Sequence, residues 1–218
     1  WCIPKLDAQF IWRMEDILDL YQQPYDPLYP VVGFDETPYQ LIGETQTPLP
    51  TQPGQVLRYD YEYQRKGTRN LFVFFQPQQR WRTVKITLRR TKIDFAQAMR
   101  DLVDVHFPDA VKVRVVLDQL NTHTPAALYE AFSPEEARRI LRRLEFHHTP
   151  VHASWLNITE IEISVLSTQC LDRRIGCPEK LPHEIAPWQK RRNLDQATVE
   201  WRFTTSDAIA KLHLLYTP

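Results

Sequence analysis

The sequence predicts an α/β fold in which a mixed β-sheet is flanked by helices. Two segments, residues 31–35 and 111–117, contain the apolar runs that are typical of strands covered on both faces. Three further segments between residues 58 and 88 have the composition and turn signals of a strand meander. Amphipathic helices precede, separate and follow these strands, and this order of elements indicates an α/β domain.

The N-terminal part is predicted to be a helix followed by a strand. Residues 7–21 place apolar side chains at helical spacing, and Asp7 is suited to cap the start of this helix. A proline-rich connector then leads into the strand at residues 31–35, which ends in the carboxylate of Asp35. The next proline-rich stretch, residues 45–55, is expected to be irregular.

The middle of the chain is predicted to hold the meander, a helix and a second buried strand. The meander strands cover residues 58–64, 71–75 and 81–88, with tight turns at residues 66–68 and 76–78. Residues 93–106 show helical spacing of apolar side chains, and residues 111–117 alternate before they become wholly apolar. This second buried strand also ends in a carboxylate, that of Asp118.

The rest of the chain is predicted to be mostly helical. Two helices cover residues 125–132 and 133–144, and Ser133 with Glu136 forms a capping-box pattern at the start of the second. The remaining predicted elements are a short strand at residues 145–148 and helices at residues 157–171 and 181–193.

The charge distribution is compatible with a nucleic-acid partner but does not by itself indicate one. The 27 basic residues equal the 27 acidic residues, so the chain as a whole has no positive field. The basic residues nevertheless cluster within residues 80–92, 138–143, 173–174 and 190–192. Such clusters are most often solvated faces, so they allow DNA contact and do not establish it.

The three cysteines form no recognisable site. Cys2, Cys170 and Cys177 are odd in number and lack C-x-x-C spacing, which fits a reducing cytoplasm better than a disulfide framework. With His183, the last two would lack a fourth zinc ligand and standard spacing, so ordinary buried thiols are the preferred interpretation. The sequence has no apolar stretch of membrane length and no signal peptide, and it starts at Trp1 without an initiator Met, as a fragment would.

Two carboxylates occupy equivalent places in the predicted sheet. Asp35 and Asp118 each follow an apolar run, and sites in α/β sheets form beyond the carboxyl ends of strands. If the two strands are neighbours, the like charges repel and one aspartate stays protonated unless a hard divalent cation such as Mg²⁺ joins them. The alternative is that each aspartate only caps the turn that follows it.

A third carboxylate would have to come from the helix predicted over residues 157–171. At about 100° per residue, Glu160 lies on a polar face with small serines, whereas Glu162 lies within the apolar arc, where an unpaired charge is costly. Glu160 also has a structural interpretation, because Asn157 and Glu160 together form a capping pattern. Helical geometry alone leaves the role of Glu160 open.

Few other residues suggest chemistry. Asn121 and His123 follow Asp118 closely, and His123 could steady a metal ligand, contact phosphate or complete a turn. The other histidines show no metal-ligand spacing. No G-x-S-x-G, H-E-x-x-H, Walker or G-x-G-x-x-G motif occurs, and nothing selects a two-carboxylate glycosidase, although one is physically possible.

Three segments, in this order, resemble the catalytic blocks of bacterial insertion-sequence transposases of the "six-thirty" family, a branch of the mariner superfamily. They are FDET at residues 34–37, VLDQLNTH at residues 116–123 and SWLNITEI at residues 154–161. The similarity extends to residues 60–63, 98–103 and 137–148, and so it covers nearly the whole chain.

The resemblance implies an RNase H-like fold of the retroviral-integrase type with a DDE triad. Asp35, Asp118 and Glu160 match the family's catalytic, metal-binding carboxylates, which implies Mg²⁺ or Mn²⁺, as two ions. The family cuts double-stranded DNA at element ends and transfers the strands into a TA target. His123 matches the histidine of the D-x-x-N-x-H block, and with Asn121 it is expected to play a supporting role.

The resemblance also implies partners and a location. DNA contacts are expected from Arg138, Arg139, Arg142, Arg143, His152 and Trp155. The chain departs from its relatives at Tyr39 and Val151, where a basic residue is frequent, and at Ala153, which replaces a usual glycine. The family's N-terminal helix-turn-helix region, which would recognise the terminal repeats, is absent from the sequence. The resemblance further allows a homodimer, and it predicts a cytoplasmic, nucleoid-associated bacterial protein without a membrane partner.

Three segments and one function are therefore expected. Residues 1–28 would form an N-terminal helix and linker, residues 29–175 the RNase H-like DDE catalytic core, and residues 176–218 a C-terminal helical extension packed on the core. The expected function is metal-dependent cleavage and strand transfer of an insertion sequence. Two alternatives stay open: a truncated, non-catalytic transposase remnant, and a stand-alone RNase H-like nuclease that only hydrolyses DNA.

Overall fold

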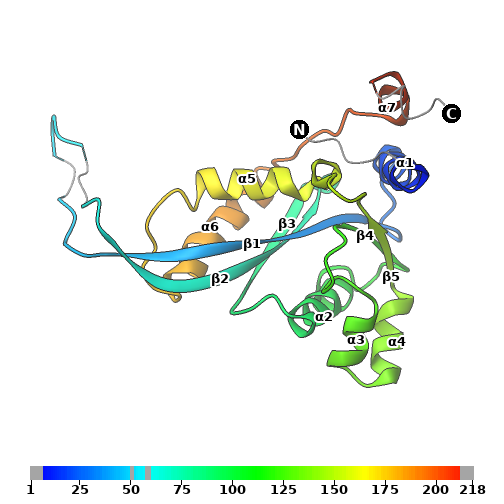
Figure 1. The fold of residues 1–218 in the computed structure, drawn as a ribbon, viewed down its shortest axis with the longest axis horizontal. Helices are drawn as coiled ribbons and strands as arrows, with labels where there is room; N and C mark the ends of the chain where they lie inside the picture. Colours follow the sequence, from blue (N-terminus) through cyan, green and yellow to red (C-terminus); the bar gives the residue numbers. More distant parts are fainter. Residues whose placement is uncertain (1–6, 50–51, 57–59, 212–218) are drawn as a thin grey trace.

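A five-stranded mixed sheet forms the centre of the protein, as a computed structural model that describes residues 7–49, 52–56 and 60–211 shows (Figure 1). The strand order is β3-β2-β1-β4-β5, in which β3, β2 and β1 are antiparallel and β1, β4 and β5 are parallel. The strands are β1 (Val31–Glu44), β2 (Tyr63–Gln76), β3 (Trp81–Thr87), β4 (Val113–Leu117) and β5 (Leu144–His148). The predicted α/β class with a mixed sheet is therefore confirmed.

Helices cover both faces of this sheet. One face carries α2 (Lys92–Asp101), a π-helical turn (Leu102–His106), α3 (Ala126–Ala131) and α4 (Pro134–Arg142). The other face carries α1 (Ala8–Gln22), a 3-10 turn (Ser154–Leu156), α5 (Thr159–Gln169) and α6 (Lys180–Leu194), and α7 (Thr205–Lys211) packs on α1. The parallel strand pairs arise because the helices of the first layer connect β3 to β4 and β4 to β5.

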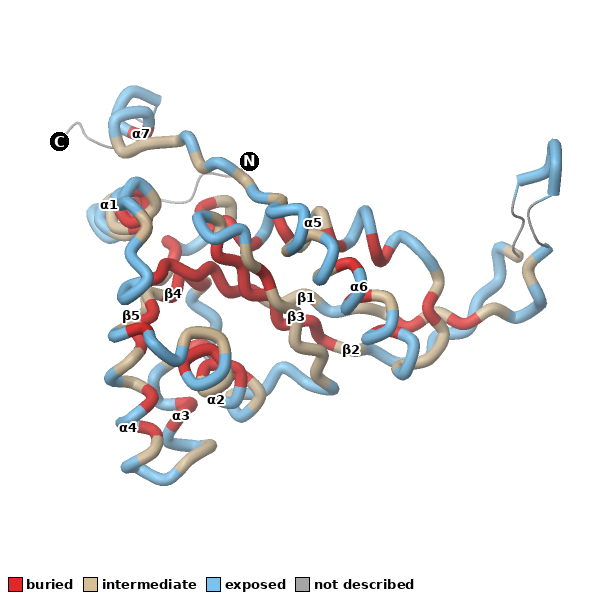
Figure 2. The backbone as a smooth tube through the Cα atoms, turned by 180° about the vertical axis from the view of Figure 1, so that it is seen from behind, coloured by how far each residue is buried: buried red, intermediate tan, exposed pale blue. Residues whose placement is uncertain are grey.

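The alternation of side chains along the strands assigns each residue to one of two cores. In β2, Phe72 and Phe74 pack against the α2 layer, whereas Leu71 and Val73 pack against α5 and α6. In β1, Phe34 faces the α2 layer, so Asp35 is directed to the α5 face. Figure 2 shows the buried residues concentrated between the two layers, while the far end of the β1–β2 hairpin is largely exposed.

Several predicted helices are confirmed together with the residues that begin them. Helix α1 begins after Asp7, whose Oδ1 accepts the backbone N–H of Phe10 at 2.9 Å. Helix α4 begins after Ser133, whose hydroxyl accepts the backbone N–H of Glu136 at 3.4 Å. Helix α2 has a reciprocal capping box that the sequence reading missed, between Thr91 and Asp94. Helix α7 was also missed.

The predicted meander is wrong in its first two strands. A single strand, β2, covers the whole predicted strand 71–75 and only residues 63 and 64 of the predicted strand 58–64, of which residues 58 and 59 lie outside the described part of the chain. The Lys66-Gly67-Thr68 signal does not reverse the chain, because Gly67, at φ 94°, lies beside a register shift in the β1–β2 pairing between Gln40 and Ile42. The antiparallel part of the sheet is therefore β1-β2-β3.

The first buried strand is longer than predicted. It was expected to end at Asp35, but β1 continues to Glu44, because β2 pairs with it from Gly33 to Glu44. Asp35 therefore lies inside a strand, opposite Val73, and does not follow one. Conversely, β4 begins only at Val113, since the backbone N–H groups of the two residues before it bond to the carbonyl of Leu28.

The structure bears in part on the expectations about the cysteines and about membrane-spanning segments. Cys170 is buried and Cys177 is partly buried, and both are free thiols, while Cys2 lies outside the described residues. None of the helices in the described part of the chain is both long and apolar enough to span a bilayer.

Candidate active site

The parallel pairing of β1 and β4 brings two of the predicted carboxylates side by side. Gly33 on β1 pairs with Val116 on β4, so Asp35 and Asp118 lie two residues further along neighbouring strands. This is the place where the sheet changes from antiparallel to parallel pairing, because β1 is bonded to β2 on its other edge. The expectation that the two strands are neighbours is confirmed, even though Asp35 lies inside β1.

A close approach of α5 to β1 adds the third carboxylate. A Cβ atom on Gly33 would come within 2.2 Å of Thr159 Oγ1, so only glycine lets the start of α5 approach this strand. The Asn157 amide nitrogen donates to the carbonyl of Phe34 at 2.8 Å and lies 3.3 Å from Asp35 Oδ2. These contacts hold Glu160, in the first turn of α5, near Asp35.

Gly33 and Asn157 are site-building residues that the sequence reading missed. A glycine within an apolar strand is a usual signal of close backbone approach, so Gly33 could have been identified. Asn157 was considered only as part of a capping pattern with Glu160, and the N-cap position of α5 belongs to Ile158. The Asn157 side chain instead joins α5 to β1, because its oxygen accepts the backbone N–H of Thr159 at 3.1 Å while its nitrogen bonds to β1.

Negative charge is concentrated around Asp35, which is only 8% exposed. Burial and then the charge of Glu160, with smaller effects from Asp118 and Glu36, raise the pKa of Asp35 to about 7. Glu160 and Asp118 therefore both act electrostatically on Asp35. Among the described residues, however, no three His, Cys, Asp or Glu side chains are arranged as a ready set of ligands for one metal ion.

His123 lies behind the site and contacts two carboxylates, that of Asp118 and that of the buried Glu36, which is not one of the predicted three. Its imidazole is 1% exposed and packs against Phe34 and Phe95, with ring centroids 5.2 and 5.0 Å away. Nδ1 lies 2.5 Å from Asp118 Oδ1, and Nε2 lies 2.9 Å from Glu36 Oε2. Burial disfavours the imidazolium, but the two carboxylates outweigh burial and raise the pKa of His123 to about 9, so it is charged at neutral pH.

The same contact keeps Asp118 ionised. Burial alone would raise the pKa of Asp118, but the hydrogen bond and charge of His123 lower it below its usual value. The two aspartates of the site therefore differ, since Asp118 is balanced by a cation and Asp35 is crowded by anions. Asn121, the other predicted supporting residue, lies exposed in the turn between Asp118 and His123.

Most of the predicted DNA-contacting residues lie apart from the carboxylates. The four arginines are on or next to α4, on the opposite face of the sheet from Asp35. Arg139 pairs with Asp104 and Glu136, and Arg143 donates to three backbone carbonyls, so both already have partners within the chain.

The other four predicted contacts are more accessible or lie closer to α5. Arg138, Arg142 and His152 are exposed. Trp155 precedes α5 and packs edge-on against Phe203, with ring centroids 5.7 Å apart. The structure thus brings together the three carboxylates and His123, but it does not gather the predicted DNA-binding residues into one patch.

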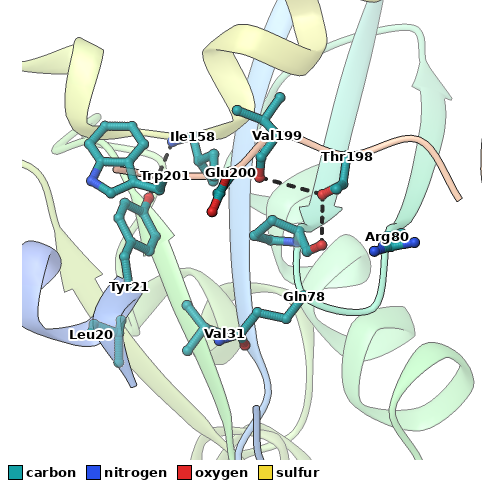
Figure 3. Close-up of a pocket in the computed structure, with 11 residues that line it drawn as sticks. Leu20, Tyr21, Val31, Gln78, Arg80, Ile158, Thr198, Val199, Glu200 and Trp201 are labelled. Atoms are coloured by element: carbon teal, nitrogen blue, oxygen red, sulfur yellow. Dashed lines mark hydrogen bonds between the residues drawn. The ribbon is translucent and has the colours of Figure 1, made fainter. Parts of the chain in front are cut away.

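A separate cavity of about 440 Å³ lies beside the start of β1 and the segment before α5 (Figure 3). Tyr21 lies beneath Trp201 there, with ring centroids 5.0 Å apart. The Tyr21 hydroxyl donates to the carbonyl of Leu156 at 2.9 Å and accepts the N–H of Ile158 at 3.2 Å. None of the three carboxylates lines this cavity, so its tyrosine supports the start of α5 from α1 and does not belong to the candidate site.

Comparisons with known proteins relate the chain to DDE endonucleases and to transposase structures. The model of a family described as "DDE superfamily endonuclease" matches residues 30–182. Among solved structures, the chain is similar to the Mos1 transposase paired-end complex with left transposon end, at 15% identity and a TM-score of 0.58, with 90% of this chain and 60% of that chain covered. No curated protein sequence matches the chain significantly.

Two further structures are similar to a comparable degree. The Mos1 mariner paired-end complex with Mn gives 15% identity and a TM-score of 0.58, covering 99% of this chain and 62% of that one. The complex with Mg gives 13% identity and a TM-score of 0.56, covering 97% and 64%. At these identities the likeness concerns the fold, and it confirms the predicted RNase H-like type; the chain spans about 60% of the length of the solved chains.

Proposed function

Since the chain belongs to the DDE superfamily of endonucleases, we propose that it is the catalytic domain of a transposase that cuts and rejoins DNA. The observation that carries this proposal is the crowding of Asp35 by Glu160 and Asp118 at the junction of β1, β4 and α5. The structural neighbours are transposases in complex with transposon ends. The three sequence blocks favour the finer assignment to the bacterial "six-thirty" family.

Asp35, Asp118 and Glu160 would hold the divalent cations. Their hard oxygen atoms and mutual repulsion suit Mg²⁺ or Mn²⁺, and two of the neighbouring Mos1 complexes contain Mn or Mg. When bound, such a pair of ions would activate the attacking oxygen and stabilise the leaving oxygen of a phosphodiester. The carboxylates must draw together for this, because among the residues described here they are not yet a ready ligand set.

The three carboxylates would have different roles in cation binding, in part because the protonation states of the two aspartates differ. Asp118 is ionised, and its Oδ1 is held by His123, so it offers Oδ2 to a cation. Asp35, with a pKa of about 7, is only partly ionised near neutral pH and would have to release its proton when a cation binds. Glu160 is exposed and free to turn toward the same point, as a ligand that completes the site.

The partners follow from the same proposal. Double-stranded DNA, as element ends and as a TA target, would be the substrate, contacted by the accessible Arg138, Arg142, His152 and Trp155. An N-terminal helix-turn-helix region would recognise the terminal repeats, and two copies would pair the element ends as a homodimer. We place this activity at the bacterial nucleoid, with residues 29–175 as the catalytic core between the N-terminal segment and a C-terminal extension.

An Asp118→Asn variant tests the proposal. The substitution keeps the shape and an oxygen that can accept from His123, but it removes the charge that a cation needs. We expect Mg²⁺-dependent nicking of duplex DNA to fall by at least about a thousandfold, equivalent to about 4 kcal/mol of the activation barrier. Nicking is measured on gels, and circular dichroism checks that the fold is retained.

Asp109→Asn is the matched control, because Asp109 lies exposed in a turn before β4. Full Mg²⁺-dependent activity in the Asp118→Asn variant would contradict the assignment. Supplying pre-cut DNA with free 3′-hydroxyl ends then separates a transposase, which joins strands, from a nuclease that only hydrolyses.

A non-catalytic transposase remnant is the second candidate. The specific observation in its favour is that no ready three-ligand group occurs among the described residues. Mn²⁺ binding without strand cleavage, even after a DNA-binding region has been attached, would support this candidate over the first.

A further inference from the structure

Glu36 is a buried carboxylate to which neither the predicted triad nor the supporting residues assign a role. It follows Asp35 on β1, so its side chain lies on the opposite face of the strand, where it is 1% exposed. Its Oε2 lies 2.9 Å from His123 Nε2, while Arg90, half exposed, approaches Oε1 only to 3.9 Å. Burial of an unbalanced carboxylate is costly, so His123 is the group that compensates Glu36.

The contacts of His123 form a chain through the sheet. The imidazole lies between two rings, those of Phe34 and Phe95, which restrict its tilt. Its Nε2 is held from behind by Glu36 and its Nδ1 contacts Asp118, whose side chain is 30% exposed on the site side. Asp118, which is partly exposed, is thus linked through a buried histidine to a buried carboxylate.

We propose that Glu36 is a positioning residue that orients Asp118 for cation binding by fixing the His123 imidazole. This inference rests on the proposed function, because it gives a role in cation binding to residues behind the carboxylates. The physical basis is that the partners of a metal ligand set its orientation, and their loss commonly weakens metal affinity by about 10- to 100-fold. Asp35 and Glu36 then serve the same site from opposite faces of β1.

The test measures Mn²⁺ affinity of the chain by the electron paramagnetic resonance signal of free Mn²⁺, in the absence of DNA. Glu36→Gln keeps the size of the side chain and removes its charge, whereas Glu36→Asp keeps the charge but is one methylene too short to reach His123. We expect both variants to bind Mn²⁺ at least about tenfold more weakly. Glu135→Gln, an identical change at an exposed position on α4, should leave the affinity unchanged.

A second arm uses His123→Phe, which keeps an aromatic ring between Phe34 and Phe95 but removes both nitrogen contacts. If Glu36 acts through His123, the double variant with Glu36→Gln binds Mn²⁺ no more weakly than the weaker single variant. Additive losses would show that Glu36 acts on the site independently, and would overturn the proposal. Should Glu36→Gln fail to fold, Glu36→Asp decides alone.

The remaining outcomes separate this inference from the proposed function. Wild-type affinity in Glu36→Gln, or in Glu36→Asp, would overturn the positioning role, the latter because the charge alone would then suffice. A chain that shows the expected losses of Mn²⁺ affinity but never nicks or joins DNA would keep the positioning role and reject the transposase. A chain that binds no Mn²⁺ at all would reject both.

Discussion

Helix α5 carries two glutamates, two residues apart, whose surroundings are opposite. Glu162 is fully buried between two guanidinium groups, with its Oε1 2.9 Å from Arg82 Nε and 3.0 Å from Arg192 Nε. Glu160 is exposed and lies near Asp35, and no ion pair holds it within the described part of the chain. Glu162 is thus part of a mostly buried cluster of opposite charges, and Glu160 is part of an anionic one.

The Arg82–Glu162–Arg192 cluster joins three elements of the fold. Arg82 comes from β3, Glu162 from α5 and Arg192 from α6. The Asn193 side chain accepts the backbone N–H of Arg82 and donates to its carbonyl, both at 3.0 Å. Arg82 also lies over the ring of Phe75, 5.2 Å from its centroid. These contacts fix α5 and α6 on the sheet, and so they set where the first turn of α5 begins.

The difference teaches how to tell structural charges from functional ones. A buried ion pair is held in place because each charge is desolvated and needs its partner, so it serves the folded state. Like charges that crowd one another destabilise the folded state and persist where an external cation can balance them. By this criterion the carboxylates around Asp35 point to a ligand, and Glu162 does not.

The largest expected effect comes from neutralising each glutamate of α5 in turn. Glu162→Gln leaves the fully buried Arg82 and the partly exposed Arg192 without a counter-charge, so we expect the free energy of unfolding to fall by about 3–5 kcal/mol. Glu160→Gln removes one of the charges that crowd Asp35, so it should not lower stability, but it should weaken Mn²⁺ binding. Urea unfolding followed by circular dichroism measures the first effect, and a Mn²⁺ titration measures the second.

The two variants are each other's control, because the chemical change and the helix are the same. Equal losses of stability in both would mean that the two glutamates do not differ in the way their surroundings indicate. Weak Mn²⁺ binding in a fully folded Glu162→Gln variant would likewise contradict the distinction between a structural Glu162 and a cation-binding Glu160.

A second prediction concerns pH and the anionic cluster. The pKa of Asp35 is about 7 in the folded chain and about 3.8 in the unfolded chain, so protonated Asp35 favours folding. This contribution is complete below pH 3.8 and is lost as the pH rises through 7, and its size is about 4 kcal/mol. Without divalent cations, the chain should therefore lose this stability, relative to Asp35→Asn, between pH 4 and pH 8.

The measurement is the difference in unfolding free energy between the chain and its Asp35→Asn variant, in EDTA, across this range. The difference is needed because His123 has its own pH dependence: its stabilising contribution is complete below pH 6.5 and is lost as the pH rises through about 9. Mg²⁺ should restore the lost stability of the unaltered chain near pH 8 but not add as much to the variant. A difference that does not change with pH would contradict the crowding of Asp35.

Much of this arrangement could be read from the sequence, and the parts that could not are tertiary. Apolar runs predicted the buried strands β1 and β4, and helical spacing placed Glu160 and Glu162 on different sides of α5. The helical spacing correctly put Glu162 in the buried apolar arc. It could not identify the residues that pair with Glu162, because Arg82 and Arg192 come from distant elements. Pairing across such distances depends on strand order, which local patterns do not determine.

The extent of β1 and the role of Glu36 were missed for a related reason. A strand ends where its pairing ends, and β1 continues past Asp35 because β2 is long enough to pair with it. That extension turns Glu36 to the opposite face, toward His123, which comes from the turn after β4. In contrast, the convergence of Asp35 and Asp118 needed only neighbouring parallel strands, and this was predictable.

The smallest effect, and the one that links the two clusters, is expected from Gly33→Ala. The new methyl group would lie 2.2 Å from Thr159 Oγ1 and 3.1 Å from Ile158 Cγ2, so the start of α5 must move away from β1. The Arg82–Glu162–Arg192 cluster anchors the middle of α5 and resists this movement, so the helix should tilt about that anchor and not detach. We expect a loss of about 1–3 kcal/mol of stability and weaker Mn²⁺ binding.

Gly43→Ala, on the same strand, is the matched control, because its nearest neighbour at 3.0 Å is the flexible end of the Lys66 side chain. It should leave Mn²⁺ binding unchanged and cost less stability. If Gly33→Ala destabilised the chain but bound Mn²⁺ normally, the position of Glu160 would not matter to the cation site. If it weakened Mn²⁺ binding as expected while Gly43→Ala did not, the close approach at Gly33 would be what turns a structurally anchored helix into one that delivers a ligand.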